Sequence, residues 1–556
     1  MEYIQEIRAL VGHRPLILVG CGALIVRDGN VLLQKRSDNH LWGIHGGCME
    51  IRETTEQTMI REVYEECGIT PTEYELFGVF SGEDVHNIYP NGDECYFVNV
   101  EYLVTGWEGD FRKQDSEVEE LRWFKISEMP PNEQITPGDR QALGKLKATY
   151  EKEWKAMPYS IHDKDYLIST DKENVMQSYG RFPIVFERGN GARVYDSEGK
   201  EYIDFMSGIG VLSLGHCNTQ WIGAVTKQAS SLAHVSNYYY TAPYIKLSER
   251  ICASSGMKNM IFGNSGAEAN EAAIKIARKY SNDKYPWQNR NTIVTLNQSF
   301  HGRTVTTLAA TGQEHFHTSF MPFTQGFKHV AATIPALENA ITDSVCAVMV
   351  EMIRGEGGVL PMEREFADYL KTLQERDILL IIDEVQTGIG RTGKLFAFQH
   401  YGLKPDLITM AKGLGGGLPI GACAASERCA SVLTSGTHGS TFGGNPVVCA
   451  GANAVLDIVN NEDFLESVTK KGRYIKESIE KMNFPFIKSF RGMGLMIGLE
   501  IGDGYSHKEL SKKLTFGGLL AITAGDDALR FLPPLTITYE EIDTGLAIFE
   551  RVLREG

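Results

Sequence analysis

The chain has 556 residues, which at roughly 150 residues per domain is enough for several structural units. Hydrophobic residues make up 42% of the chain and charged residues 23%, and the formal net charge is −16, so the composition indicates a globular protein that binds neither nucleic acid nor an anionic membrane surface. The ten cysteines form no CxxC pair and no regular spacing, which favours reduced thiols in a cytoplasmic protein over disulfides or a zinc site.

The first 150 residues are expected to form one α/β unit. An apolar run at residues 15–26 is too short to cross a membrane and is expected to be a buried strand, and further strands are expected near residues 31–33 and 96–103. A charged helical stretch over residues 145–155 stops before Pro158, and we expect a linker at residues 151–165.

One strong helix is expected within this unit, over residues 54–67. Thr54 and Gln57 have the spacing of a capping box, and Gly68 is placed to end the helix in the left-handed conformation. Three glutamates of this helix then fall on one face at i, i+3 and i+4, and they are Glu62, Glu65 and Glu66. Carboxylates this close repel one another unless a hard cation such as Mg²⁺ binds them, although three glutamates taken alone favour a solvated acidic face.

From about residue 166 to residue 556 the pattern changes to repeated strand-then-helix units. Residues 292–296 and 378–382 are two examples of short apolar strands followed by helical segments. Such alternation predicts a mainly parallel sheet covered by helices on both faces.

Two of the predicted strands end in residues that suit pyridoxal phosphate (PLP). Asp383 follows the apolar run 378–382, and Lys412 follows a second short strand and precedes a glycine-rich stretch at 413–417. A lysine beside a buried strand is costly unless it is paired or used covalently. PLP needs both groups, because the lysine binds it covalently and an acid keeps its pyridine nitrogen protonated. Read alone, Asp383 could instead be a helix N-cap.

Two further segments could complete a cofactor site. Ser265, Gly266 and Ala267 open a predicted helix, where free N–H groups would bind a phosphate, although an ordinary capped helix gives the same pattern. Phe300 could stack on a pyridine ring, and Arg303 could bind a substrate carboxylate through two hydrogen bonds.

Together these segments resemble the class III aminotransferases, and most closely their acetylornithine branch. The matching stretches occur in family order at residues 178–205, 263–278, 300–304, 379–393, 405–422, 438–446 and 530–538. The resemblance implies the PLP fold of type I, in which a large domain (about 216–449) holds the mainly parallel sheet and a small α/β domain combines about 166–215 with 450–556. It also implies an amino donor of the acetylornithine type and 2-oxoglutarate as the acceptor, giving glutamate.

The resemblance assigns roles to individual residues. It implies a covalent bond from Lys412 to PLP and a contact from Asp383 to the pyridine nitrogen. It places the remaining cofactor contacts at Val385 and Phe300 on the ring faces, Gln386 near the ring oxygen, and Ser265, Gly266 and Ala267 at the phosphate. Thr441 is expected to reach the phosphate of the neighbouring subunit, so a homodimer is expected.

The substrate contacts are implied in the same way, at Arg303, Ser440, Arg530 and Glu356. Arg530 resembles the arginine that binds the α-carboxylate of glutamate, and Glu356 resembles the acid that masks this arginine when the other donor is bound. Such a pair favours transamination over the racemisation, decarboxylation or amino-group migration that PLP also supports. The sequence departs from its relatives at Ile209, Leu212 and Arg354, which leaves other ω-amines open as donors, such as 4-aminobutyrate or a carrier-linked amine.

The first 150 residues resemble the Nudix hydrolases, because Gly47, Glu53, Arg61 and the three helix glutamates fill every fixed position of the Nudix box. The resemblance implies an α/β/α sandwich and Mg²⁺ bound by Glu62, Glu65 and Glu66. Glu53 and Glu66 are then expected to take part in catalysis on a nucleoside diphosphate-type ligand. The alternative is a nucleotide-sensing module that regulates the aminotransferase.

Overall fold

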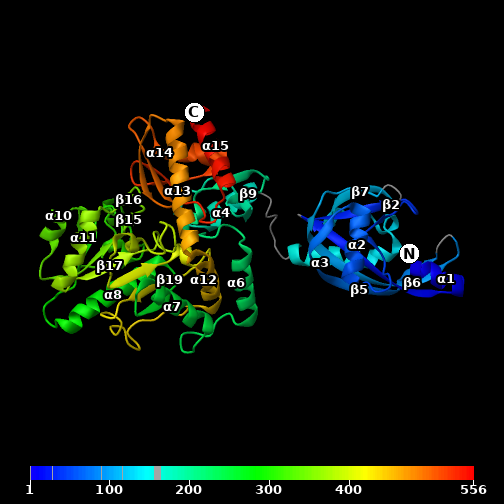
Figure 1. The fold of residues 1–556 in the computed structure, drawn as a ribbon, viewed down its shortest axis with the longest axis horizontal. Helices are drawn as coiled ribbons and strands as arrows, with labels where there is room; N and C mark the ends of the chain where they lie inside the picture. The colour runs from blue at the N-terminus through cyan, green and yellow to red at the C-terminus, as the bar shows by residue number, and fades with distance from the viewer. Residues whose placement is uncertain (1, 28, 89–90, 115–116, 156–163, 556) are drawn as a thin grey trace. The chain divides into compact units, whose positions relative to one another are not determined.

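The computed structural model describes residues 2–27, 29–88, 91–114, 117–155 and 164–555. The chain divides into two compact units, Met1–Asp163 and Lys164–Gly556, which are treated separately (Figure 1). Residues 156–163 of the expected linker lie outside the described residues. No helix in the described parts of the chain has the length and apolar character needed to cross a membrane.

The first unit is a mixed sheet between two helices. Its elements are the helices α1 Glu2–Val11, α2 Thr55–Cys67 and α3 Arg140–Lys155, the strands β1 Leu16–Arg27, β2 Asn30–Arg36, β3 Trp42–Gly43, β4 His45–Cys48, β5 Thr70–Ile88, β6 Glu94–Glu108 and β7 Val118–Lys125, and the 3-10 helices η1 Ile126–Glu128, η2 Asn132–Gln134 and η3 Pro137–Asp139. Strands β1 and β6 pair in parallel, and the other recorded strand pairs of this sheet are antiparallel.

Alternation along β1 divides the apolar side chains between two cores. Ala23 and Ile25 pack with Met59 and Val63 of α2 on one face. On the other face Leu24 packs with α3, through Ala142, Leu143 and Leu146. The expected α/β/α sandwich is confirmed, and its physical basis is the period of two in a strand that is buried on both faces.

Local signals in the sequence predicted the bounds of α2 well, but they predicted β6 and α3 to be shorter than they are. The capping box of Thr54 and Gln57 is present, and Gly68 ends the helix with φ 79°. Strand β6 is longer than the expected 96–103, and α3 begins at Arg140 rather than at 145. The extra residues include buried apolar side chains such as Val104, Ala142 and Leu143, but polar residues and glycines interrupt them, so no continuous hydrophobic pattern marks the ends of these elements.

The second unit is built around a seven-stranded sheet in the order β11-β19-β18-β17-β14-β12-β13. Its strands are β11 Asn259–Gly263, β12 Thr292–Leu296, β13 Phe327–Val330, β14 Val345–Val350, β17 Leu379–Asp383, β18 Leu407–Met410 and β19 Gly421–Ala425. Only β19 runs against its two neighbours, so the sheet is mainly parallel as expected. Helix α8 Gly266–Lys284 packs on one face, and α7 Ala242–Ser255, α11 Arg364–Leu373 and α12 Pro446–Val459 contribute to the core on the other.

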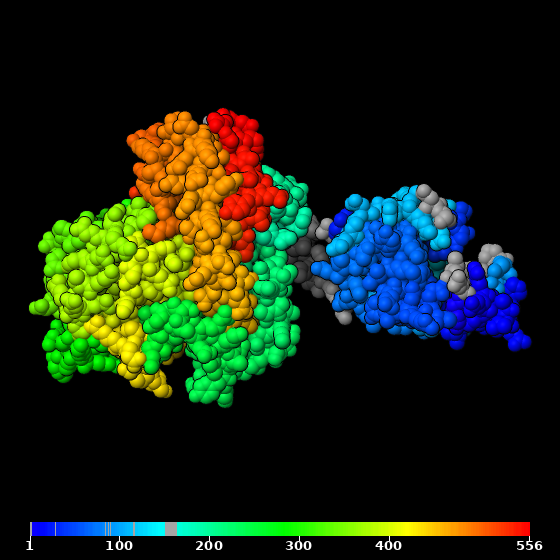
Figure 2. Space-filling model, in the orientation of Figure 1, coloured from blue at the N-terminus to red at the C-terminus, as the bar shows by residue number. Residues whose placement is uncertain are grey.

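Two four-stranded sheets complete the second unit. The first, β22-β10-β9-β8, joins early and late parts of the chain, because β10 Glu201–Asp204 pairs in parallel with β22 Leu519–Leu520. The same neighbourhood is visible in Figure 2, where turquoise residues border the red C-terminal residues. The second sheet has the order β20-β21-β24-β23, and β24 Ala528–Phe531 carries Arg530.

The remaining elements of the second unit are the helices α4 Lys164–Asn174, α5 Ser207–Gly210, α6 Thr219–Ser231, α9 Val305–Ala310, α10 Ile334–Ala340, α13 Glu462–Met482, α14 His507–Gly517 and α15 Tyr539–Glu555, the strands β8 Phe186–Asn190, β9 Arg193–Asp196, β15 Ile353–Arg354, β16 Leu360–Pro361, β20 Ile487–Met493, β21 Met496–Ile501 and β23 Ile522–Ala524, and the 3-10 helices η4 Glu314–His317, η5 Gln374–Arg376, η6 Ala397–Tyr401 and η7 Lys412–Leu414.

Candidate active site

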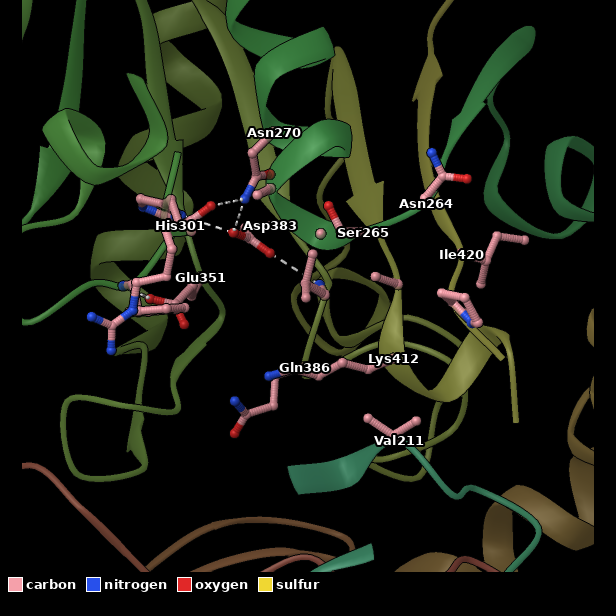
Figure 3. A pocket seen from close by; sticks show the side chains of 18 of the residues that line it. Val211, Asn264, Ser265, Asn270, His301, Glu351, Asp383, Gln386, Lys412 and Ile420 are labelled. Atoms are coloured by element: carbon pink, nitrogen blue, oxygen red, sulfur yellow. Dashed lines mark hydrogen bonds and ion pairs between the residues drawn. The ribbon is translucent and has the colours of Figure 1, made fainter. Parts of the chain in front are cut away.

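The carboxyl ends of β17 and β18 open into a cavity of about 430 Å³ in the second unit. Asp383 is the last residue of β17, and Lys412 follows β18, its parallel neighbour. Both side chains line the cavity, and Figure 3 shows them around the same space with Gln386. The edge of a parallel sheet where strands end is the usual ligand-binding edge of such folds.

The Asp383 carboxylate is buried and held by three neighbours. Its Oδ2 accepts a hydrogen bond from Asn270 Nδ2 at 2.8 Å and lies 2.8 Å from Nδ1 of His301, and its Oδ1 accepts one from the Val385 N–H at 3.0 Å (Figure 3). Burial alone would lower the pKa of His301, but the hydrogen bond and charge of Asp383 outweigh it, and the pKa is raised.

Lys412 combines burial with an unusual backbone. Its φ of 44° is uncommon for a residue with a side chain and is found where a structure holds a functional group in place. Burial lowers the pKa of the Lys412 ammonium, and the charge of Arg530 acts in the same direction, against the opposing charges of Glu356 and Asp383. A lysine with a lowered pKa is more often neutral and nucleophilic.

The opposite end of the cavity is the start of α8. Ser265 is the N-cap residue, and its hydroxyl accepts a hydrogen bond from the Glu268 N–H at 3.2 Å. A Cβ on Gly266 would lie 2.7 Å from Val385, so the close approach of this helix to Val385 requires glycine. The N-terminal end of a helix favours an anion, and a phosphate would fit this end of the cavity.

These residues fit PLP as a set. An amine and a carboxylate lie at neighbouring strand ends, a helix N-terminus supplies a phosphate cradle, and Phe300 and Val385 give the cavity apolar walls. The fit therefore rests on the chemistry of the side chains as well as on the size of the cavity.

Beside the cavity, the buried Arg530 forms a network with Gln386 and the partly buried Glu356. Arg530 is 2% exposed, and its Nη1 donates to Glu356 Oε1 at 2.7 Å and to Gln386 Oε1 at 2.9 Å. Gln386 Nε2 also donates to Glu356 at 3.2 Å. Burial alone would raise the pKa of Glu356, but the charge and hydrogen bond of Arg530 bring it below its ordinary value.

In the first unit, the guanidinium of Arg61 lies among the acidic side chains of α2. It donates to both oxygens of Glu53, at 2.7 and 2.9 Å, and to Glu62 at 2.6 Å, and it lies 3.6 Å from Glu65. Glu66 is buried and accepts a hydrogen bond from the Gly46 N–H at 2.9 Å. Burial raises the pKa of Glu62, whereas the hydrogen bond from Arg61 lowers the pKa of Glu53.

The carboxylate oxygens suit Mg²⁺ chemically, but in this arrangement Glu53 and Glu62 accept hydrogen bonds from Arg61. Within the described parts of the chain, no three His, Cys, Asp or Glu side chains are grouped so that they could hold a metal ion. The metal site at Glu62, Glu65 and Glu66 therefore remains a prediction, which requires Glu62 and Glu65 to turn from Arg61.

Comparisons with known proteins decide the family of the second unit. Residues 175–553 match the family model for Aminotransferase class-III. The chain belongs to the class III aminotransferase family. Residues 17–146 match the model of the NUDIX domain, so a Nudix domain precedes the aminotransferase.

Curated relatives and solved structures agree with this assignment. The acetylornithine aminotransferase of Caldanaerobacter subterraneus is 48% identical over 393 residues, which cover 70% of this chain and 99% of the relative. The ornithine aminotransferase of Toxoplasma gondii has a TM-score of 0.69 at 32% identity over 73% of this chain and 98% of its own. The N-acetylornithine aminotransferase of Stenotrophomonas maltophilia has a TM-score of 0.61 at 35% identity, over 70% and 98% of the two chains.

Some of the residues predicted to contact the substrate or cofactor line the cavity, and others lie outside its wall. Arg303 lines the cavity, but its guanidinium packs over Phe316, 4.1 Å from the ring centre. Ser440 lies next to the cavity wall and bonds Asn264, whose Nδ2 donates to its hydroxyl at 3.2 Å. Thr441 is exposed.

Sequence reasoning missed the residues that support Asp383 from behind. His301 was part of a matching stretch without a role, and Asn270 lies one turn into α8. A third residue, Glu351, is buried in the cavity wall and accepts hydrogen bonds from the N–H groups of Phe300 at 3.0 Å and Gly355 at 3.4 Å. Burial raises the pKa of Glu351 to about 7.

Proposed function

We propose that the aminotransferase unit moves an amino group from an ω-amine donor of the acetylornithine type to 2-oxoglutarate, with PLP held by Lys412. This proposal rests on one observation: Lys412 and Asp383 line the same cavity, and the start of α8 lies at its far end. The named activity of the curated relatives supports the choice of donor class.

The side chains of this unit divide the chemical work. Bound PLP supplies an electron sink for the carbon that carries the donor amine. Asp383 holds a proton on the pyridine nitrogen, supported by Asn270 and His301. Lys412 Nζ, which is neutral more often because its pKa is lowered, takes up the proton that leaves the donor carbon.

Arg530 and Glu356 give one site two substrate specificities. When glutamate binds, Glu356 turns away and Arg530 holds a carboxylate. When the ω-amine binds, the Arg530–Glu356 pair stays closed, as in the arrangement described above, and presents little net charge. Gly355 and Gly357 on either side of Glu356 allow this movement.

A panel of amine donors with 2-oxoglutarate tests the proposed reaction. We expect acetylornithine-type donors to give the highest kcat/KM and free ornithine to be poor, because Ile209 offers no hydrogen-bonding group. A preference for 4-aminobutyrate or a carrier-linked amine would contradict the choice of donor while leaving the transaminase assignment in place.

Arg530→Lys is expected to weaken the glutamate half-reaction by roughly ten- to a hundredfold, or about 1.5–3 kcal/mol, because a lysine cannot form the two-point contact with a carboxylate. The half-reaction with the ω-amine should change much less. Stopped-flow absorbance of each half-reaction measures both. Arg491→Lys is the matched control, since Arg491 also holds carboxylates, Asp527 and Glu500, in the same sheet. Equal losses in the two half-reactions would show that Arg530 is only structural.

Glu356→Ala should have the opposite effect, with faster reaction of glutamate and impaired reaction of the ω-amine, because Arg530 is then never masked. Glu356→Gln serves as a second variant, since it keeps a hydrogen-bond acceptor for Arg530 and limits the cost of leaving a buried charge unpaired. If both variants lose the two half-reactions equally, Glu356 has no masking role.

We also propose that the aminotransferase works as a homodimer in which Thr441 reaches the phosphate of the neighbouring subunit. Thr441 is exposed and lies on the segment after Ser440, so it is accessible to a second copy. Sedimentation and the PLP affinity of Thr441→Val test this: a dimer with weakened PLP binding is expected, and a fully active monomer would contradict it.

The Nudix unit is proposed to hydrolyse a nucleoside diphosphate-type compound with Mg²⁺ bound by Glu62, Glu65 and Glu66. The full Nudix box and the buried position of Glu66 support catalysis. The second candidate, a nucleotide-sensing module, is favoured by the engagement of Glu53 and Glu62 with Arg61.

Glu66→Gln should lower the rate of Mg²⁺-dependent release of phosphate or nucleoside monophosphate by at least about a hundredfold, because it removes a hard anionic ligand. Transamination should not change, because the fold stays intact. Glu56→Gln, at an exposed position in the first turn of the same helix, is the matched control. If the unmodified chain cuts no compound in a broad diphosphate panel, the sensing module becomes the better explanation.

A further inference from the structure

Glu351 follows strand β14 and precedes the segment that carries Glu356. In the sheet, β14 lies between β12, which leads toward Phe300, and β17, which ends at Asp383. The Glu351 side chain is 6% exposed and lines the cavity wall (Figure 3). The division of chemical work proposed above gives this buried carboxyl group no role.

The two oxygens of Glu351 bind two different segments of the site. Its Oε2 accepts a hydrogen bond from the Phe300 N–H at 3.0 Å, and its Oε1 accepts a longer one from the Gly355 N–H at 3.4 Å. Burial raises the pKa of Glu351, and these two hydrogen bonds oppose the rise, as bonds to an ionised carboxylate do. Glu351 therefore ties Phe300, on the apolar wall of the cavity, to the residue next to Glu356.

Arg354 makes a second tie between the same two segments. Its Nη1 donates to the carbonyl of Asn297 at 3.0 Å, and the side-chain oxygen of Gln298 lies 3.5 Å away. Burial lowers the pKa of the Arg354 guanidinium, and the charge of Glu351 opposes this, so the two ties lie near one another. The sequence departs from its relatives at Arg354, so the second tie distinguishes this chain from them.

The segment before Phe300 has little freedom of its own. Gln298 has a φ of 64°, which is uncommon for a residue with a side chain, and its N–H donates to the Gly312 carbonyl at 2.7 Å. A Cβ on Gly357 would lie 2.3 Å from the Gln298 carbonyl oxygen, so the segments on either side of the two ties are packed in direct contact. A displacement of one segment must therefore be shared by the other.

Gly355 connects the ties to the network of Arg530. A Cβ on Gly355 would lie 2.4 Å from Gln386 Oε1, which is the oxygen that accepts a hydrogen bond from Arg530. The same residue gives its N–H to Glu351 and is joined by a peptide bond to Glu356. Movement of Glu356 away from Arg530 therefore acts directly on the hydrogen bond between Gly355 and Glu351.

We propose that Glu351 is a positioning residue that couples the mask to the apolar wall of the cavity, so that the turning of Glu356 moves Phe300. This inference rests on the proposed masking of Arg530 by Glu356. With the mask closed, Glu351 holds both N–H groups, and Phe300 keeps the position described here. With the mask open, Glu351 and Arg354 draw the Phe300 segment along. The two amine donors then meet a cofactor site whose wall differs in shape.

The affinity of the PLP-saturated full chain for glutarate tests this coupling. Glutarate is glutamate without its amine, so it requires an unmasked Arg530 but cannot react. Phe300→Leu is expected to change the glutarate Kd by about fivefold or more, because coupled sites alter each other's affinities reciprocally. In the Glu351→Gln background the same change should be less than about twofold, because glutamine has a single acceptor oxygen and one of the two N–H groups loses its partner. Isothermal titration at about pH 8, where Glu351 is ionised, gives the four Kd values.

Glu365→Gln, exposed on α11, is the matched control and should leave the effect of Phe300→Leu unchanged. The circular dichroism of bound PLP is a second readout, since glutarate should alter it in the unmodified chain and at least about fivefold less in Glu351→Gln. If Glu351→Gln fails to retain PLP, Arg354→Ala at its half-buried position takes its place. It should reduce the effect of Phe300→Leu by about twofold or more.

The outcomes separate the coupling from the masking on which it rests. If Arg530→Lys weakens glutarate binding but Phe300→Leu has the same effect with and without Glu351→Gln or Arg354→Ala, the coupling alone is refuted. Glu351 would then serve only to fill the cavity wall. Glutarate binding that Arg530→Lys leaves unchanged would overturn the proposed masking, and the coupling with it.

Discussion

Lys412→Ala is expected to abolish transamination and to remove the visible absorbance of covalently bound PLP. Lys412 is the lysine in the cavity wall, where burial lowers its pKa and so favours the neutral amine that attacks a carbonyl. Alanine leaves the apolar walls and the helix N-terminus in place, so PLP should still bind, but weakly and without a covalent bond. Activity should fall by several orders of magnitude.

The measurement for Lys412→Ala is the absorbance spectrum together with borohydride reduction and peptide mapping. Lys404→Ala is the matched control, because Lys404 is exposed in the loop that leads into the same strand. The control should keep the spectrum and the rate. PLP found reduced onto another lysine of an active Lys412→Ala protein would refute the assignment.

That Asp383 and Lys412 lie in one cavity could be predicted, because each residue carries a strong local signal. Asp383 ends one short buried strand and Lys412 follows another, and a polar residue at the end of such a strand stands out in the sequence. Parallel pairing of consecutive strands then brings the two ends together. The capping of α2 was predictable for the same reason, since Thr54, Gln57 and Gly68 act within a few residues of one another.

The supports of Asp383 could not be predicted in this way. His301 and Asn270 lie 82 and 113 residues from Asp383 in the sequence. The order of β12, β14 and β17 in the sheet brings His301 close, and the packing of α8 against the sheet brings Asn270 close. Histidine and asparagine are also common in ordinary loops and helices, so neither residue gives a local signal.

In the Nudix unit the sequence pattern was strong, but it was incomplete. The spacing of Glu62, Glu65 and Glu66 predicted one acidic face, yet it could not show that Arg61 pairs with Glu53 and Glu62 across that face.

Substitution of Asp383, which Asn270 and His301 hold in place, is the second change with a large expected effect on activity. Asp383→Asn is expected to lower kcat by several orders of magnitude while PLP stays bound, because a neutral pyridine accepts electrons poorly. Asparagine keeps the size of the side chain and can still accept a hydrogen bond from the Val385 N–H. It cannot keep a proton on the pyridine nitrogen, and it no longer stabilises the charge of His301.

Two readouts separate this role from a structural one. The pKa of His301, followed by NMR, should fall in Asp383→Asn, since the hydrogen bond and charge of Asp383 are what raise it against burial. Asp406→Asn is the matched control: Asp406 is also buried next to this sheet, where it accepts the Leu380 N–H at 2.9 Å, but it lies outside the cavity lining. The control should lose stability without a comparable loss of kcat. If Asp383→Asn lowers kcat less than tenfold, the pyridine nitrogen needs no acid here, and the burial of Asp383 beneath Asn270 and His301 serves the fold alone.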